Sequence, residues 1–527
     1  MLATVVSATL HGLDGRVIRV EVDVAPGLPG FTIVGLPDAA LQEARERVRG
    51  AIRNAGFVYP PRRIAVNLAP ADLRKAGASL DLAIAVGILL GSEQVRPGRL
   101  RTALVGELSL GGEVRSVPGV LPMVAALVRR GIRRVIVPAD AADEAALVGG
   151  LEVLPVTALT EAVDFVRSPR GRRGGPIARR VGLGEPEGGR DEVLRTDRDM
   201  TLPDGSRAPD LADVRGQVEA RRALEIALAG GHGVVLIGPP GSGKTLLART
   251  IPGLLPPLAD AEALAATVVA SASGSRPVRE LVRRPPFRSP HHTISYAAMV
   301  GGGPRLSPGE VTLADHGILF LDELPEFGRD VLEALREPLE EGRVAISRVG
   351  RATTFPARFQ LVAAMNPCPC GMAGTDSGAC TCRPGLPERY QARISGPLRD
   401  RIDLWVVMPR LPPAVLVGGP EPEGSAVVRA RIAAARVVQL GRPPTRLNAR
   451  VGGRALRAAC QLSGDAAARV VELAELERLS GRGTERLLRV ARTIADLDSA
   501  AAVGEAHLDE AARFRSPVAS FAQRLAS

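Results

Sequence analysis

The feature that most constrains this chain is a glycine-rich segment, Gly238-Pro239-Pro240-Gly241-Ser242-Gly243-Lys244-Thr245. An apolar run at 234–237 precedes it and predicts a buried strand, and residues 246–249 indicate the start of a helix. A strand, a glycine loop and a helix in this order form a phosphate-binding loop, because the loop N–H groups and the helix N-terminus both attract phosphate oxygens. We therefore predict ATP as the ligand, with Lys244 reaching the β- and γ-phosphates and Thr245 holding Mg²⁺.

The lysine content supports this role for Lys244. Of the 68 basic residues in the chain, all but Lys75 and Lys244 are arginines. Lysine is a compact point charge that fits inside a phosphate cradle, whereas arginine is a broad planar fork. We therefore expect the lysine in the glycine-rich segment to have a functional role.

A second apolar run, at residues 317–321, ends in Asp322 and Glu323. Such a run predicts a buried strand that presents carboxylates at its carboxyl end, where ligands of α/β folds bind. Asp322 is expected to hold Mg²⁺ through water, and Glu323 to orient or deprotonate the attacking water. The alternative is an ordinary strand followed by an acidic turn.

Composition limits the class of protein. A chain of 527 residues predicts three or four domains, and its net charge of +11 suggests a nucleic-acid partner or a compositional drift towards arginine. Aromatic residues make up only 3% of the chain, so base stacking is not expected to dominate contacts with DNA. No signal peptide or membrane span is evident, and five cysteines without a disulfide-like pattern suit the reducing cytoplasm.

The pattern of the chain predicts an overall α/β organisation. Residues 1–167 read as a separate domain, residues 168–209 as a flexible linker rich in Gly, Pro, Arg and Glu, residues 210–410 as the ATPase core, and residues 425–527 as a helical region. In the first domain we expect strands at 17–24, 63–68, 103–105 and 135–137, and helices opening at 37, 79 and 121. The linker is expected to be a solvated tether, with tracking along DNA as the alternative.

Two insertions lengthen the ATPase core. Residues 278–308 contain many prolines and glycines, which predicts an inserted loop without helix, and His291 and His292 within it are expected to make hydrogen bonds rather than bind a metal. A helix at 330–341 precedes a predicted β-hairpin at 342–355 that carries Arg343, Arg348 and Arg351. These arginines are candidates for contacts with DNA phosphates, and a purely structural hairpin is the alternative.

Four cysteines lie close together after this hairpin, at positions Cys368, Cys370, Cys380 and Cys382. Four thiolates can close a tetrahedral site around a structural Zn²⁺, although C-x-C spacing is less usual than C-x₂-C. The alternative is a set of free or redox-active thiols. Cys460 is expected to be a core thiol.

Residues 1–167 resemble the Lon-type, ribosomal-S5-like domain of magnesium-chelatase-related ATPases. The segment Lys75-Ala76-Gly77-Ala78-Ser79 resembles the one that carries the Lon nucleophile, which would make Ser79 the serine. The dyad lysine would align with Leu121, and residues 76–130 contain no lysine. A serine without a base is a poor nucleophile, so we expect a scaffold or regulatory domain rather than a protease.

Several segments resemble motifs of AAA+ ATPases. Residues 213–217 resemble the lead-in that packs on adenine, and Asn366 matches the polar first sensor that contacts the γ-phosphate or its water. Arg401 matches the arginine finger, which reaches the nucleotide of a neighbouring subunit, with a plain ion pair as the alternative. Arg399 departs from the family pattern and leaves open which arginine acts. Arg482, with Arg489 as the second candidate, resembles the second sensor of a C-terminal lid.

The order of these segments resembles the ComM/YifB family of magnesium-chelatase-like AAA+ ATPases over nearly the whole chain. The resemblance implies a Lon-like α+β domain, a phosphate-loop α/β core with inserted loops, and an α-helical lid. It also implies a cytoplasmic homo-oligomer, expected to be a hexameric ring, that drives branch migration of single-stranded or branched DNA during recombination and natural transformation. A magnesium-chelatase motor subunit and a Lon-related protein remodeller are the alternatives.

Overall fold

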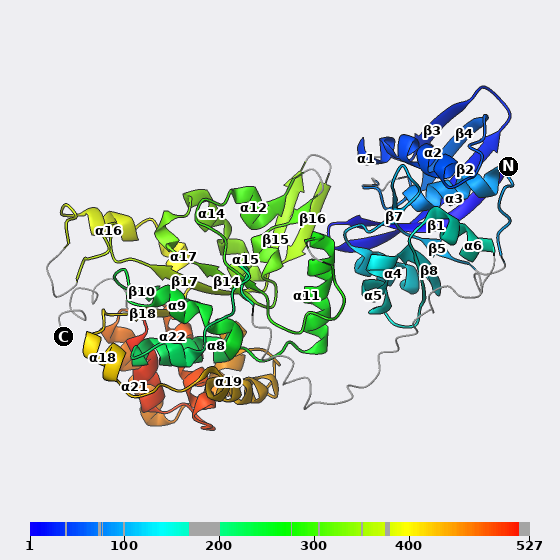
Figure 1. Ribbon diagram of the computed structural model, residues 1–527. Coiled ribbons are helices and arrows are strands. Elements are labelled where there is room, and N and C mark those ends of the chain that lie inside the picture. The colour runs from blue at the N-terminus through cyan, green and yellow to red at the C-terminus, as the bar shows by residue number, and fades with distance from the viewer. Residues whose placement is uncertain are drawn as a thin grey trace.

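The computed structural model describes residues 1–36, 39–71, 75, 77–98, 101–167, 201–275, 277–303, 306–348, 351–374 and 380–515. An N-terminal domain lies at one end of the molecule, and a larger body contains the phosphate loop and the C-terminal helices (Figure 1). The predicted linker up to residue 200 and the last part of the predicted helical region, residues 516–527, lie outside the described residues.

The N-terminal domain is built on a seven-stranded sheet of order β3-β4-β2-β1-β5-β8-β9. β1, β2 and β4 are antiparallel neighbours, and the remaining pairs are parallel. Its strands are β1 (Leu2–His11), β2 (Asp14–Ala25), β3 (Gly30–Val34), β4 (Arg63–Ala69), β5 (Ala103–Leu104), β8 (Arg134–Pro138) and β9 (Glu152–Val156), with a small hairpin of β6 (Glu107–Leu108) and β7 (Val114–Arg115). Its helices are α1 (Ala39–Gln42), α2 (Ala44–Asn54), α3 (Asp81–Gly91), α4 (Val120–Arg129), α5 (Ala142–Ala146) and α6 (Leu159–Arg167).

The expected elements of this domain are present with small shifts. In β2 the alternating residues Ile18, Val20, Val22 and Val24 are buried, as a half-buried strand requires. α3 is apolar around nearly its whole circumference, and only Leu90 is partly exposed, so the helix lies inside the domain core. The helix expected to open at residue 37 consists of the two pieces α1 and α2, and residues 37 and 38 lie outside the described residues.

The ATPase core is a parallel sheet of order β11-β14-β17-β10-β18 flanked by helices. The strands are β10 (Val234–Ile237), β11 (Phe287–Arg288), β14 (Ile318–Leu321), β17 (Gln360–Met365) and β18 (Leu404–Val407). The helices are α8 (Val218–Gly230), α9 (Lys244–Arg249), α10 (Ile251–Leu254), α11 (Asp260–Ser273), α12 (Tyr296–Val300), α13 (Glu310–Leu313), α14 (Arg329–Ala334), α15 (Arg336–Glu341), α16 (Leu386–Gln391) and α17 (Gly396–Arg399), with hairpins β12 (Gly301–Gly302)–β13 (Ser307–Pro308) and β15 (Arg343–Arg348)–β16 (Arg351–Pro356).

Three expectations for this core need correction. The helix predicted at 330–341 is divided into α14 and α15, because Pro338 has no N–H to donate to the carbonyl of Ala334. The first insertion does contain a helix, α12, whose N-terminus is capped by Ser295: its Oγ accepts a hydrogen bond from the Ala298 N–H at 3.2 Å. The same insertion contributes β11 to the parallel sheet.

The third correction concerns the end of the predicted linker. Residues 201–209 pack against the ATPase core, where Arg249 contacts Asp204 at 2.6 Å and Ser206 at 2.7 Å. Leu202 is buried, and Thr201 forms a β-bridge with Arg207. Residues 201–209 were predicted to be linker because they are polar, but they form a short turn that belongs to the ATPase core.

The C-terminal region is helical, as predicted, through residue 513. It comprises α18 (Pro413–Gly418), α19 (Ser425–Leu440), α20 (Gly453–Cys460), α21 (Gly464–Leu476), α22 (Gly481–Leu497) and α23 (Glu505–Arg513). These helices lie beneath the parallel sheet (Figure 1), and α19 to α23 share one hydrophobic core with α8 and β10. None of the helices in the described ranges is long and apolar enough to cross a lipid bilayer.

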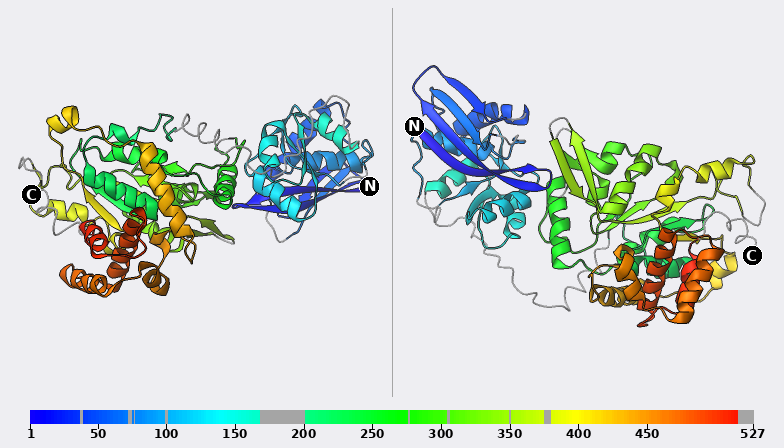
Figure 2. Two further views of the ribbon diagram at one scale, coloured as in Figure 1. Left: turned by 90° about the horizontal axis from the view of Figure 1, so that it is seen from below. Right: turned by 180° about the vertical axis from the view of Figure 1, so that it is seen from behind.

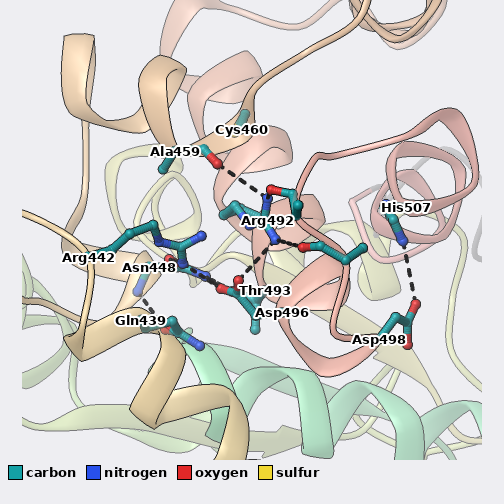
Figure 3. A network of polar contacts seen from close by, with 12 residues as sticks. Gln439, Arg442, Asn448, Ala459, Cys460, Arg492, Thr493, Asp496, Asp498 and His507 are labelled. Carbon is teal, nitrogen blue, oxygen red and sulfur yellow. Dashed lines mark hydrogen bonds and ion pairs between the residues drawn. The ribbon is translucent and has the colours of Figure 1, made fainter.

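A buried polar network joins these C-terminal helices to each other and to the core (Figure 3). Asp496 accepts hydrogen bonds from Arg492 at 3.0 Å, Arg442 at 2.7 Å and Asn448 at 2.8 Å. Asn448 also donates to Thr493 Oγ1 at 3.0 Å. Buried polar groups cost free energy unless they are paired, so this network holds α22 in one defined position.

The network continues into the sheet through His232. Its Nε2 lies 2.8 Å from Thr493 Oγ1, and its Nδ1 lies 2.9 Å from Asp403 Oδ2. Asp403 follows the arginine-finger candidate Arg401 by two residues. The helical region is thus connected by hydrogen bonds to the segment that carries this arginine.

The N-terminal domain contacts the ATPase core through α11 and the β15–β16 hairpin, as both views of Figure 2 show. Gly119 N–H donates to the Ser271 carbonyl at 2.9 Å, and Ser271 Oγ donates to Glu144 at 2.6 Å. At the turn between β1 and β2, Gly12 has φ +61°, and a Cβ there would lie 2.6 Å from Thr353 Cγ2. A side chain at position 12 would therefore push the turn away from the hairpin.

The Glu144 contact predicts that docking of the two domains depends on pH. Burial raises the pKa of Glu144, while its bonds to Ser271 and to the Leu121 N–H oppose that rise. A group with a raised pKa contributes its full stabilisation below its ordinary pKa, and this contribution is lost as the pH rises through the raised value. We expect hydrogen exchange, corrected for its intrinsic pH dependence, to show more frequent opening at the Gly119 and Leu121 amides at pH 8.5 than at pH 4, which lies below the ordinary pKa of a glutamate.

The charge-neutral variant Glu144→Gln tests this interpretation. Its opening equilibrium at Gly119 should lose most of the pH dependence, because the amide does not ionise. Glu161→Gln, which removes an exposed carboxylate in the same domain, is the matched control and should behave as the wild type. An unchanged pH profile in Glu144→Gln would contradict the assignment.

Candidate nucleotide-binding site

The phosphate loop has the geometry that its sequence predicts. β10 is fully buried and leads into the loop, and α9 begins at Lys244. Gly241 and Gly243 have φ values of +79° and +90°, a region that residues with a side chain rarely adopt. A Cβ at Gly238 would lie 2.3 Å from the Met408 carbonyl oxygen, so this glycine is required by close packing against the end of β18.

Lys244 lies inside the loop and is only 8% exposed. Its ammonium group donates to the carbonyls of Gly238 at 2.8 Å and Pro239 at 2.9 Å, and contacts Asn366 Oδ1 at 3.3 Å. Burial lowers the pKa of Lys244, and the nearby Asp322 and Glu323 oppose that shift. The structure therefore brings the loop lysine and the predicted sensor asparagine together.

Thr245 and Asp322 also meet, as expected for a magnesium site. Thr245 Oγ1 donates to Asp322 Oδ2 at 2.7 Å, and Asp322 Oδ1 accepts from the Glu323 N–H at 2.9 Å. Asp322 directly follows β14, at the carboxyl edge of the parallel sheet. A hydroxyl and a carboxylate at this separation fit the oxygen ligands that Mg²⁺ prefers.

Glu323, which is expected to orient or deprotonate the attacking water, has a partner that sequence reasoning did not identify. His292 Nδ1 lies 3.1 Å from Glu323 Oε2. The imidazole lies tilted against that of His291, with ring centroids 4.1 Å apart, and meets Phe327 edge-on. His292 thus reaches from the first insertion to the candidate catalytic glutamate, whereas His291 bonds to Thr293 within its own loop.

This contact predicts that His292→Ala lowers kcat for ATP hydrolysis by about tenfold with little change in KM, because the Glu323 carboxylate loses the group that orients it. Steady-state phosphate release checks both parameters. His291→Ala is the matched control: His291 bonds to Thr293 within its own loop at 2.9 Å. An equal loss in both variants would assign the effect to loop folding.

Gln217 is a further residue of the site that was expected only as part of the lead-in segment. Its side chain donates to the carbonyls of Ser242 at 3.0 Å and Pro409 at 2.8 Å, and its φ is +47°. It thereby joins the lead-in segment to the phosphate loop and to the chain after β18. Gln217 and its partners lie far apart in the sequence, so no local sequence motif predicts these hydrogen bonds.

The candidate arginine finger, Arg401, and the candidate second sensor, Arg482, lie near one carboxylate. Arg401 forms an ion pair with Glu340 on α15 and donates to the Pro397 carbonyl at 2.7 Å. Arg401, and more weakly Arg482, lower the pKa of Glu340. Arg482 is exposed at the start of α22, so both guanidinium groups are positioned beside α15.

Arg399 and Arg489, the second candidates for the arginine finger and the second sensor, form hydrogen bonds with backbone carbonyls. Arg399 donates to the carbonyls of Ile394, at 3.0 Å, and Gln391. Arg489 donates to the Val451 carbonyl at 2.6 Å and lies inside the helical region. Both arginines are thus held by backbone carbonyls of this chain.

The predicted hairpin is present as β15 and β16. Arg343 pairs in register with Pro356 and forms an ion pair with Glu341 at 2.9 Å. Arg348 lies opposite Arg351 as the last pair before the turn. The hairpin therefore places two of the three candidate DNA-contacting arginines at its tip.

The four clustered cysteines converge, as their spacing predicts. Their ligand atoms all lie within 4.8 Å of one another, and none forms a disulfide. This set is the one group of metal-ligating side chains found in the described part of the chain. Cys460 is a buried core thiol, as expected.

The residues that resemble a protease dyad do not form one in the described structure. Lys75 is buried and donates to the Pro70 carbonyl. Ser79 is buried, and its Oγ has no hydrogen-bond partner among the described residues. The Leu121 N–H donates to Glu144 at the position where a lysine would be needed.

Three family models match the chain in order. The model for subunit ChlI of Mg-chelatase matches residues 20–141, that for magnesium chelatase, subunit ChlI, matches residues 210–416, and that for the ChlI C-terminal region matches residues 422–515. The phosphate loop, parallel sheet and helical region lie within the last two of these ranges. The protein is magnesium-chelatase-like.

Relatives of similar length refine this assignment. The chain is 43% identical over 506 residues to the YifB protein of Escherichia coli K12, covering 96% of this chain and 95% of that one. It is 42% identical over 516 residues to YifB of Salmonella typhimurium, covering 98% and 97%. It is 41% identical over 520 residues to the competence protein ComM of Haemophilus influenzae, covering 98% of each. The chain belongs to the YifB/ComM family.

Proposed function

We propose that this protein is an ATP-driven DNA motor that promotes branch migration during recombination. The observation that carries the proposal is the convergence of Lys244, Thr245, Asp322 and Asn366 in one site, on a chain that resembles a competence protein over its whole length. The ligands of the site are ATP and Mg²⁺. The partners are single-stranded or branched DNA and further copies of this chain.

Each residue of the site has a separate role in ATP hydrolysis. The loop N–H groups and Lys244 bind the phosphates of ATP, and Thr245 and Asp322 would hold Mg²⁺, which supplies charge neutralisation when bound. Glu323, oriented by His292, accepts a proton from the attacking water, and Asn366 positions that water.

Arg401 reaches the nucleotide of an adjacent subunit and stabilises the charge of the transition state, which requires a ring, expected to be a hexamer. Arg482 on the lid stabilises the γ-phosphate. Arg401 has to leave its ion pair with Glu340 before its guanidinium group can contact the neighbouring nucleotide.

The hairpin tip couples hydrolysis to DNA. Arg348 and Arg351 stand opposite each other at the tip, and Arg343 lies at the base of β15. Guanidinium groups bind phosphates without regard to base sequence, which suits translocation. Opening and closing of the interface between subunits would move this tip along the DNA backbone.

The test is ATP hydrolysis without DNA, with single-stranded DNA and with a four-way junction. We expect the junction to stimulate hydrolysis by about tenfold or more, and Arg348→Ala/Arg351→Ala to abolish the stimulation while keeping the basal rate. The control Arg129→Ala/Arg130→Ala removes two exposed arginines of the N-terminal domain and should retain stimulation. Absence of stimulation in the wild type would overturn the proposal in favour of a magnesium-chelatase motor subunit or a protein remodeller.

A further inference from the structure

The four clustered cysteines lie on one loop, the cysteine loop, which begins at Cys368 and ends at Cys382. This loop contacts the nucleotide site at two places. It follows β17, and Cys368 lies two residues beyond the sensor candidate Asn366. On the other side, Gly371 faces the phosphate loop: a Cβ at this position would lie 2.5 Å from Pro240 Cδ. The loop therefore packs against the segment that binds the phosphates.

The distances between the sulfur atoms fit a metal rather than disulfides. Cys368 Sγ lies 3.3 Å from Cys370 Sγ and 3.9 Å from Cys380 Sγ, and Cys370 Sγ lies 3.6 Å from Cys380 Sγ. A tetrahedral Zn²⁺ site with Zn–S bonds of about 2.3 Å has S···S separations of about 3.8 Å. A disulfide would need about 2.05 Å.

The backbone around Cys368 is already arranged for a thiolate. The Ala373 N–H points at Cys368 Sγ at 3.3 Å, and the Gly371 N–H donates to the Cys368 carbonyl at 2.9 Å. Gly371 has φ +79°, which closes the turn between these two bonds. N–H groups directed at metal-bound sulfur are outer-shell partners of the kind that tune such sites.

A further bond fixes the chain between Asn366 and Cys368. The Gln391 side chain donates to the Pro367 carbonyl at 2.9 Å. Asn366 is thus held between β17 on one side and the cysteine loop on the other. Its Oδ1 accepts from Lys244, so a displacement of the loop would move a group that contacts the phosphate-binding lysine.

We propose that Cys368, Cys370, Cys380 and Cys382 bind one structural Zn²⁺, and that the metal-closed loop positions Asn366 and Pro240 for ATP hydrolysis. Four thiolates leave no open coordination position, so the metal acts through the loop and does not touch the nucleotide. Hydrolysis by this protein is therefore controlled by zinc occupancy. The positioning part rests on the proposed ATPase function, whereas zinc binding does not.

The first measurement is the zinc content of the purified full-length chain by plasma mass spectrometry. We expect one zinc per wild-type chain, none in Cys380→Ser/Cys382→Ser, and one in the control Cys460→Ala, which removes the thiol outside the cluster. Absence of zinc from wild type produced in zinc-supplemented medium would overturn the proposal. Because this readout requires no activity, it stays decisive even if the protein does not act on DNA.

The second measurement separates positioning from folding. Gly371→Ala keeps all four cysteines but places a methyl group against Pro240, so we expect full zinc content with kcat lowered by about tenfold. Gly385→Ala is the matched control, since Gly385 has φ +80° with no heavy atom within 4 Å of its added Cβ. Equal kcat in both variants would overturn the positioning role.

A chelation experiment covers the case in which the cysteine variant does not fold. Treating the wild type with 1,10-phenanthroline should lower both zinc content and kcat, and adding back Zn²⁺ should restore both while Mg²⁺ is constant. Full hydrolysis by the zinc-depleted chain would contradict the coupling. If the wild type shows no hydrolysis, the ATPase proposal fails, and hydrogen exchange of residues 360–374 with and without zinc then tests whether the metal orders Asn366.

Discussion

Replacing Lys244 with alanine is expected to abolish ATP binding and to lower hydrolysis by more than about 100-fold, the size of effect seen when one preorganised donor to a developing charge is removed. Lys244 is 8% exposed, and its ammonium group is already held by two loop carbonyls and Asn366. It therefore meets the phosphates with little loss of side-chain entropy. Titration with a fluorescent ATP analogue and phosphate release measure the two effects.

The chain supplies a matched control for this variant. Lys75 is the other lysine, and it lies buried in the N-terminal domain, where it donates to Pro70. Lys75→Ala should retain nucleotide binding at Lys244. Normal hydrolysis in Lys244→Ala would refute the assignment of the site.

The scarcity of lysine also permits a test on the unmodified protein. An amine-reactive acetylating reagent can modify Lys244, Lys75 and the N-terminus, and mass spectrometry resolves the three. ATP with Mg²⁺ should protect Lys244 selectively, because the phosphates occupy the space around its ammonium group.

Glu323→Gln is expected to give a different result from Lys244→Ala. The amide cannot accept a proton from water, but it leaves Lys244 and the loop N–H groups unchanged. This variant should bind ATP with near wild-type affinity, hydrolyse it at least about 100-fold more slowly, and accumulate as an assembled ring in size-exclusion chromatography. Loss of binding in Glu323→Gln would show that the acid has a structural role.

The phosphate loop and the acidic pair could be predicted because each is a local pattern. The turn of the loop depends on Gly241 and Gly243, whose backbone conformations only glycine adopts easily, and the flanking apolar runs can only be buried strands. The meeting of Thr245 with Asp322 then follows from topology, since parallel strands end at the same edge of a sheet. The same reasoning predicted the cysteine cluster, because short spacings bring thiols together.

Other parts of the site could not be predicted, because they depend on contacts between segments that are distant in the sequence. His292 and Glu323 belong to different elements, and nothing in either motif indicates their 3.1 Å approach. The contacts of Gln217 with the phosphate loop likewise exist only in the folded chain. Residues 201–209 looked like a linker from composition, but two bonds from Arg249 order them against the core.

Replacing Asp496 with alanine is expected to destabilise the helical region by about 3–5 kcal/mol, because it leaves buried charge unpaired. Arg492 is 1% exposed, and Asp496 is its carboxylate partner at 3.0 Å (Figure 3). Asp496 also satisfies Arg442 and Asn448, so three donors lose an acceptor together. Carbonyls of Ala459, Ala500 and Ala501 still accept from Arg492, but they do not neutralise its charge.

Hydrogen exchange of the α22 amides measures this effect, and a loss of about 3 kcal/mol corresponds to exchange more than about 100-fold faster. Asp498→Ala, two residues further on, is the matched control: its side chain is 45% exposed and pairs with Arg222 at 3.4 Å, so the expected cost is below about 1 kcal/mol.

Because Thr493 and His232 connect this network to Asp403, Asp496→Ala should also loosen the segment of Arg401. Faster exchange at residues 401–407 in Asp496→Ala alone would establish that the helical region and the candidate arginine finger move as one unit, whereas equal exchange in both variants would separate them.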